Sequence, residues 1–196
     1  MRTFNFLLAG VGGQGTLLAS DIVADVGMRL GGDVKKSEVH GMSQRGGAVT
    51  SHVRWGERLA SPLCEMGTVD YFLAQEKLEA LRWIEFLAPT GTVLLSDQTI
   101  PPTSTVFGTD AYPDDDSVQG TLRQAAANVL RIPAQAIAVD LGNSRVANSV
   151  LLGALSAQLE FPAEAWLAVV AERVPHRHIE INRRAFMAGR EGHWRL

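Results

Sequence analysis

A glycine-rich loop near the start of the chain joins an apolar segment to a helix-like one. Residues 6–20 read FLLAGVGGQGTLLAS, with glycines at positions 10, 12, 13 and 15. The apolar run over 4–9 predicts a buried strand, and aliphatic residues at every fourth position from 18 to 30 predict a helix over 16–30. A G-x-G-x-x-G loop between a strand and a helix is typical of a Rossmann-like start to a nucleotide-binding fold.

Strand and helix patterns alternate along most of the remaining sequence. Further strands are predicted from 34 and over 48–55, 69–74, 92–96, 103–107 and 136–141, with helices over 76–87, 146–159, 162–175 and around 179–186. This alternation predicts an α/β fold of three α/β/α layers around a mostly parallel sheet. Gly56 and Glu57 predict a hairpin turn into a returning strand over 58–63, which would make the sheet mixed. The 196 residues fit a single domain, 1–196.

Composition narrows the classes of function. A net charge of −3 makes nucleic acid a poor candidate partner, and no run approaches the roughly 20 apolar residues that cross a bilayer, so no membrane partner is expected. The single cysteine, Cys64, excludes a disulfide framework and a cysteine-ligated iron–sulfur cluster within this chain. Its neighbour Leu63 favours a buried thiol over a reactive one. We expect a soluble protein of the reducing cytoplasm.

The glycine loop is the first candidate binding site. Glycines allow a close approach of the backbone to a ligand, and the N–H groups at a helix start favour an anion. The candidate contacts are Gly12, Gly13, Gln14 and Gly15. The alternative is a turn that only packs the helix on the strand. A dinucleotide site also needs an acid after the second strand; Lys35 and Lys36 stand there instead, which disfavours NAD and leaves a phosphate-rich ligand such as coenzyme A or NADP. The lysine pair is equally compatible with a solvated edge.

A polar segment over 37–47, SEVHGMSQRGG, is too polar and glycine-rich for regular structure. Ordering such a segment costs conformational entropy, which favours a contact surface for a ligand or partner chain over a flexible loop. No aspartate is placed to orient His40 toward Ser43, and Glu38 with His40 is too few ligands for a metal. We therefore predict no catalytic residue and no metal site in this chain.

Three segments together resemble a known family. GVGGQG, EVHGMSQRGGAVTSHVRWG and the following SPL resemble the gamma-type component of the 2-oxoacid:ferredoxin oxidoreductases, most closely the small (beta) subunit of the indolepyruvate-type enzymes. HGMSQRGG followed by SHVR discriminates best, and the resemblance extends through VDYFLAQEKLEALRW across the chain.

The resemblance implies a division of labour between two polypeptides. In that family a 2-oxoacid is decarboxylated on thiamine diphosphate, electrons leave through iron–sulfur clusters to ferredoxin, and coenzyme A takes the acyl group. This chain shows no thiamine-diphosphate motif and has one cysteine, so those cofactors are expected on a large (alpha) partner subunit, through which ferredoxin is reduced. The chain alone is expected to bind no cofactor and to be inactive.

The resemblance also suggests roles for the candidate residues. Gly12, Gly13, Gln14 and Gly15 become contacts for coenzyme A or the partner, with Lys35 and Lys36 as weaker phosphate contacts; His40, Ser43, Gln44 and Arg45 are expected at the junction with the partner's active site. Two alternatives remain open at this point: a free-standing Rossmann-type oxidoreductase and a non-catalytic binding module. The isolated chain is a candidate homodimer, because a partner-facing surface would otherwise be exposed.

Overall fold

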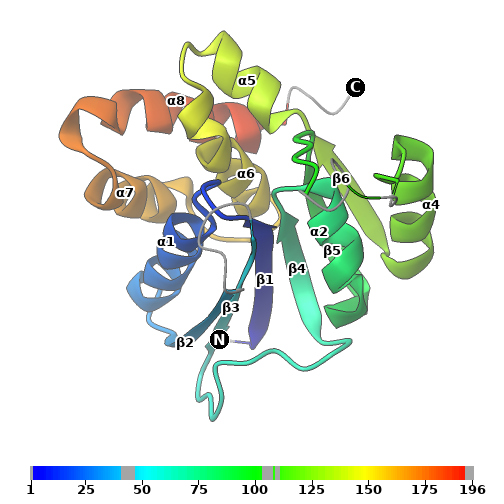
Figure 1. Cartoon of the computed structure of the whole chain (residues 1–196). Helices are drawn as coiled ribbons and strands as arrows, with labels where there is room; N and C mark the ends of the chain where they lie inside the picture. Colours follow the sequence, from blue (N-terminus) through cyan, green and yellow to red (C-terminus); the bar gives the residue numbers. More distant parts are fainter. Residues whose placement is uncertain (1, 41–46, 103–107, 109–110, 193–196) are drawn as a thin grey trace.

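A mixed β-sheet forms the centre of the molecule (Figure 1). The computed structural model describes residues 2–40, 47–102, 108 and 111–192. Within this part of the chain, six strands lie in the order β2-β3-β1-β4-β5-β6. Their bounds are β1 Phe4–Val11, β2 Asp33–His40, β3 Ala48–Gly56, β4 Val69–Ala74, β5 Leu87–Ser96 and β6 Asn128–Ile132. β1, β4, β5 and β6 are parallel, whereas β3 is antiparallel to both β1 and β2. The predicted mixed sheet is confirmed.

Helices cover both faces of this sheet, as the alternating pattern predicts. One layer contains α1 Thr16–Arg29, α5 Ala134–Asp140, α6 Ala147–Ser156, α7 Ala163–Arg173 and α8 Ile179–Glu191; the other contains α2 Lys77–Trp83 and α4 Asp115–Ala125 (Figure 1). Short 3₁₀ turns lie at Ile84–Phe86, Ser144–Val146 and His176–His178. Successive side chains of β1 enter opposite cores: Phe6 and Leu8 pack in the first, and Leu7 in the second. None of the described helices is long and apolar enough to cross a membrane.

Two glycines allow α6 and α8 to pack closely. A Cβ added at Gly153 of α6 would lie 1.9 Å from the carbonyl oxygen of Phe186, and a Cβ added at Gly189 would lie 1.9 Å from that of Val150. Every residue of α6 from Ser149 to Ser156 is buried, as expected for a helix packed on both sides. This close contact packs the middle of α6 directly against α8.

The predicted hairpin after Gly56 is wrong. Both edges of β3 are already paired, one with β1 and the other with β2, so no edge is left for a strand over 58–63. The segment instead has no regular structure, and Arg54 of β3 donates hydrogen bonds to the carbonyl oxygens of Ser61 and Leu63. Leu59 within this segment and Cys64 directly after it are buried.

The polar residues 37–40 are strand rather than loop, contrary to the prediction. They complete β2 because β3 pairs with them, Ser37 with His52 and His40 with Val49. β2 is an edge strand of the sheet, and such a position tolerates polar and charged side chains. The polarity of residues 37–40 therefore reflects their position in an edge strand and does not indicate a loop.

Other element boundaries also differ from the prediction. The run over 136–141 belongs to α5, which begins after Pro133, and the missing parallel strand is β6. A short apolar run does not distinguish a buried strand from a helix by its periodicity. The predicted helix over 76–87 ends at Trp83, and Pro89 to Gly91 lie within β5 at an irregularity in its pairing with β4. The predicted strand over 103–107 lies outside the described residues.

Candidate functional site

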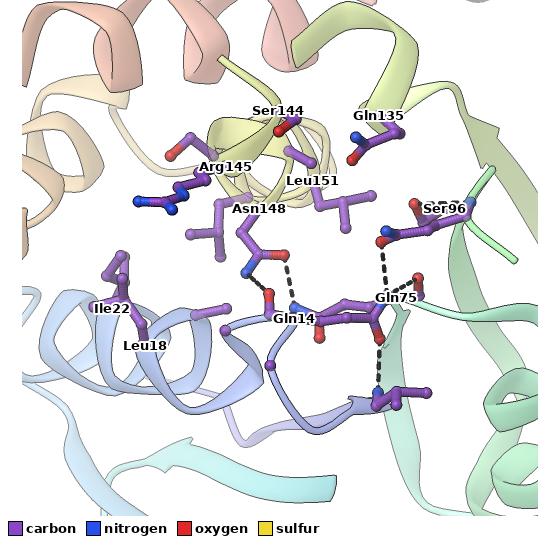
Figure 2. A pocket seen from close by; sticks show the side chains of 18 of the residues that line it. Gln14, Leu18, Ile22, Gln75, Ser96, Gln135, Ser144, Arg145, Asn148 and Leu151 are labelled. Atoms are coloured by element: carbon purple, nitrogen blue, oxygen red, sulfur yellow. Dashed lines mark hydrogen bonds between the residues drawn. The ribbon is translucent and has the colours of Figure 1, made fainter. Parts of the chain in front are cut away.

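A cavity of about 600 Å³ lies where β1, β4 and β5 end, between the glycine loop and the start of α6 (Figure 2). The floor is formed by residues at the ends of these strands: Ser96 ends β5, and Gly12 and Gln75 directly follow β1 and β4. Asn148 and Leu151 of α6 form the opposite wall, and Leu18 and Ile22 of α1 form a side. Crevices at the carboxyl ends of strands are the usual ligand sites of α/β sheets.

The glycine loop gives the cavity an uncapped helix start. Gly13 and Gly15 have φ angles of 104° and 79°, in the left-handed region that side chains disfavour, so both turns depend on glycine. Gly15 is the N-cap of α1; among the described residues no side chain caps the helix there, and its first turn contains no acid. The N–H groups of this first turn and the helix dipole therefore favour an anion at the loop.

Amide side chains from three distant segments hold the loop. The Gln14 Oε1 accepts a hydrogen bond from the Val11 N–H at 2.6 Å, and its Nε2 donates to the Gln75 carbonyl oxygen at 3.0 Å and to the Gln98 Oε1 at 2.7 Å. The Gln75 Nε2 donates to the Asn148 Oδ1 at 2.7 Å, and the Asn148 Nδ2 donates to the Gln14 carbonyl oxygen at 2.7 Å. We refer to Gln14, Gln75 and Asn148 as the amide ring (Figure 2).

Gly10 makes room for this arrangement. A Cβ added at this residue would lie 2.4 Å from the Gln75 Oε1 and 2.8 Å from both the Gln14 Oε1 and the Thr16 Oγ1. The first glycine of the loop is thus required by the amide side chains that pack against it, whereas Gly13 and Gly15 are required by their backbone angles.

The lining of the cavity contains a single kind of charge. Among the described residues that line it, none is aspartate or glutamate, and Arg145 is the charged one. Arg145 is exposed and lies across the cavity from Gln14 and Leu18 (Figure 2). A site with a helix N-terminus, neutral amides and a guanidinium suits an anionic ligand, and it offers no carboxylate for a nucleotide ribose.

The structure brings the predicted loop contacts together but separates them from the lysine pair. Gly12, Gly13, Gln14 and Gly15 all line the cavity. Lys35 and Lys36 are absent from its described lining and project from opposite faces of β2. Lys36 forms ion pairs with Asp21 of α1 and, at 2.5 Å, with Glu38, while the Lys35 Nζ lies 3.8 Å from an Asp33 oxygen.

The predicted junction residues are only partly described. His40 ends β2, with Val49 of β3 as its strand partner. Ser43, Gln44 and Arg45 lie outside the described residues. The segment returns at Gly47, whose carbonyl oxygen accepts a hydrogen bond from the Gly12 N–H at 2.8 Å. The end of the polar segment therefore contacts the glycine loop directly.

The residues predicted for the site did not include Gln75, Gln98, Arg145 and Asn148, which line the cavity. Gln75 directly follows the predicted strand over 69–74, and polar residues after a strand's carboxyl end are the usual signal of a site. The polar stretch GNSR before the apolar run of α6 was a similar signal for Arg145.

Cys64 lies outside the cavity and is buried, as predicted. Burial raises the pKa of its thiol to about 12, so the nucleophilic thiolate is scarce near neutral pH. Its N–H donates to the His52 Nδ1 at 3.3 Å, and burial lowers the pKa of that imidazole. Among the described residues, no group of three or more His, Cys, Asp and Glu is placed to hold a metal ion.

Comparisons with known proteins agree with this architecture. Residues 5–192 match the family described as pyruvate ferredoxin/flavodoxin oxidoreductase. The chain is 36% identical over 192 residues to the indolepyruvate oxidoreductase subunit IorB of Thermococcus kodakarensis, covering 96% of this chain and 95% of that protein.

Solved structures give the same result for the fold. The gamma subunit of a keto/oxoacid ferredoxin oxidoreductase from Geobacter sulfurreducens superposes with a TM-score of 0.72 at 26% identity, covering 98% of this chain and 99% of that chain. A 2-oxoglutarate:ferredoxin oxidoreductase from Magnetococcus marinus, solved with 2-oxoglutarate, coenzyme A and succinyl-CoA, matches 100% of this chain and 32% of its own, with a TM-score of 0.77 at 20% identity. The chain therefore belongs to the pyruvate ferredoxin/flavodoxin oxidoreductase family, as the gamma-type small subunit of a 2-oxoacid:ferredoxin oxidoreductase, which confirms the family predicted from its sequence.

Proposed function

We propose that this small subunit supplies the coenzyme A side of an indolepyruvate-type 2-oxoacid:ferredoxin oxidoreductase. The observation that carries the proposal is the cavity beside the glycine loop. The start of α1, which no described side chain caps, and Arg145 both line this cavity, and the described lining contains no aspartate or glutamate. Coenzyme A carries a diphosphate and a further phosphate, and such groups bind well to helix N-termini and guanidinium groups.

The size and polarity of the cavity also suit part of this ligand. A volume of about 600 Å³ falls within the range of roughly 300–1,000 Å³ that is usual for small-molecule sites. It accommodates a phosphate-bearing portion of coenzyme A, while the thiol end extends toward the partner subunit. The enzyme from Magnetococcus marinus, which has the same fold in part of its chain, was solved with coenzyme A bound.

The redox and decarboxylation chemistry belongs to the large (alpha) subunit in this proposal. That subunit carries thiamine diphosphate, which supplies the chemistry of decarboxylation, and the iron–sulfur clusters that pass electrons to ferredoxin. One cysteine in the whole chain is too few to ligate such a cluster. This chain binds and orients the acyl acceptor, and the complex works in the reducing cytoplasm.

Indolepyruvate and related arylpyruvates are the substrates that we assign to the complex. The assignment is supported by identity to the indolepyruvate oxidoreductase subunit of Thermococcus kodakarensis. A free-standing NAD-dependent enzyme is less compatible with the site, because the described lining offers no acid for the ribose hydroxyls.

A ligand titration tests the proposal. The complex with the large subunit is titrated by calorimetry with coenzyme A, NADH and NADPH, in separate experiments at one ionic strength. We expect saturable binding of coenzyme A and no binding of NADH or NADPH. Binding of NADH or NADPH without any response to coenzyme A would overturn the proposal and favour the Rossmann-type alternative.

A further inference from the structure

Every polar group of Gln75 is engaged between the walls of the cavity. Its N–H donates to the Ala9 carbonyl oxygen of β1 at 2.8 Å, and its carbonyl oxygen accepts from the Gln14 Nε2 at 3.0 Å. Its Oε1 accepts from the Thr16 hydroxyl at 2.5 Å, and its Nε2 donates to Asn148 at 2.7 Å. Gln75 is 1% exposed. One buried residue thus links β1, the glycine loop, the first turn of α1 and the start of α6.

Backbone groups fix the direction of each bond in the amide ring. The Gln14 carbonyl can only accept, so the Asn148 side chain must turn its Nδ2 toward it and its Oδ1 toward Gln75. Gln75 must then present its Nε2 to Asn148, which leaves its Oε1 for the Thr16 hydroxyl. An acceptor at the Nε2 position of Gln75 would face another acceptor and break the ring.

The adjacent side chains of Gln75 and Glu76 form hydrogen bonds with different parts of the fold. The neighbouring Glu76 side chain accepts from the N–H groups of Leu78 and Glu79 and so caps α2, on the other face of the sheet. Gln75 makes no such cap, and within the described part of the chain its side-chain bonds go to Thr16 and Asn148. Its side chain therefore holds the glycine loop relative to α6, where Arg145 precedes Asn148.

We propose that Gln75 is a positioning residue for the acyl-acceptor site: it holds the glycine loop and the first turn of α1 at a fixed distance from α6. The inference rests on the proposed function, because the loop's N–H groups and Arg145 are taken to bind the phosphates of coenzyme A from opposite walls. Gln75 itself does not react. It sets the geometry in which both walls contact one ligand, so its loss weakens binding more than turnover.

Two variants of Gln75 test this role. Gln75→Glu keeps the shape and the acceptor for Thr16 but replaces the donor to Asn148 by an acceptor, while Gln75→Leu removes both bonds. Gln158→Leu is the matched control, since its Nε2 donates to the Ala154 carbonyl oxygen at 3.3 Å and it lies outside the described lining of the cavity. Asn148→Ala breaks the same link from the other side and replaces the Gln75 variants if these fail to fold.

The first measurement needs no ligand. Hydrogen exchange of the full chain should show the amides of 12–18 exchanging at least about fivefold faster in both Gln75 variants, with α4 unchanged and the control like wild type. The second measurement uses the assembled complex, where the KM for coenzyme A should rise about tenfold, with kcat within about twofold of wild type.

The outcomes separate the two proposals. Unchanged loop exchange in folded variants, or an equal acceleration in all elements, would overturn the positioning role of Gln75. Faster loop exchange with an unchanged KM for coenzyme A would also overturn it as a binding determinant. If the wild-type complex shows no dependence on coenzyme A, the proposed function fails, while the exchange data still decide whether Gln75 holds the loop.

Discussion

Gln75 and Asn148 lie 73 positions apart in the chain and are joined by a 2.7 Å hydrogen bond between the floor of the cavity and its opposite wall. Gln75 follows a central strand, and Asn148 lies in the first turn of a buried helix. The bond connects the glycine loop to a second wall that carries the guanidinium of Arg145. The site is therefore a property of the whole α/β arrangement rather than of the glycine motif alone.

The cationic wall of the cavity gives the first prediction. Arg145→Ala should raise the KM for coenzyme A in the assembled complex by about tenfold, the loss expected for one charge-assisted hydrogen bond. Steady-state kinetics at varied coenzyme A and fixed salt measure the effect. Arg184→Ala, which removes an exposed arginine outside the described lining, is the control and should leave the KM unchanged. An equal rise in both variants would mean that general charge, not the site, is responsible.

The contact between α6 and α8 gives a prediction about stability. Gly153→Ala places a methyl group 1.9 Å from the Phe186 carbonyl oxygen, a clash that α6 and α8 relieve only by moving apart. We expect a loss of about 2–3 kcal/mol in the free energy of unfolding, measured by urea denaturation. Gly120→Ala is matched to it, because Gly120 lies within α4 with open space around its Cβ position. That variant should be neutral or slightly stabilising; similar losses in both would contradict the packing argument.

The buried thiol gives a prediction about pH. The pKa of Cys64 is raised to about 12 by burial, so the folded chain keeps its proton at a pH where the unfolded chain releases it. The unfolded state therefore gains relative stability as pH rises through the ordinary thiol pKa, and the folded protein loses stability up to about pH 12.

The reactivity of this thiol provides the measurement. Ellman's reagent at pH 8 should react slowly with the folded chain and fully after unfolding in urea. Cys64→Ala should remove the part of the alkaline destabilisation that comes from the thiol. Rapid labelling of the folded chain would contradict the burial of Cys64.

The polar segment after β2 gives a prediction about assembly. Arg45, which lies outside the described residues, was predicted at the junction with the partner's active site. Arg45→Ala should lower turnover of the complex, or the yield of complex in size-exclusion chromatography, while the circular dichroism of the isolated chain stays unchanged. Unaltered kinetics and assembly would remove Arg45 from the junction.

Long apolar segments and the glycine loop made the fold predictable. β1 and α6 were predicted within a few residues because their buried positions form continuous apolar runs, and α1 because its apolar residues recur at every fourth position. β6 and α5 were not predicted correctly. NVLRI and AIAVDL are short apolar runs, and the elements that pack around each run decide whether it forms a strand or a helix. The pairing of β3 with two strands likewise depends on long-range contacts that no local pattern encodes.

Only the contiguous part of the site, the glycine loop, was predictable from the sequence. Four adjacent loop residues were identified because the glycine motif is contiguous. Gln75, Arg145 and Asn148 approach the loop through the sheet topology, and a single sequence does not specify which polar residues meet there. Lys35 and Lys36 are adjacent in sequence, but strand alternation sends them to opposite faces, where Lys36 pairs with Asp21 and Glu38.

Reconstitution tests the central claim most directly. The large subunit is expressed with and without this chain, and viologen reduction is assayed with indolepyruvate or phenylpyruvate at varied coenzyme A. We predict that arylpyruvate oxidation responds to coenzyme A only when this chain is present. A large subunit that is equally active and equally dependent on coenzyme A in the absence of this chain would contradict the account.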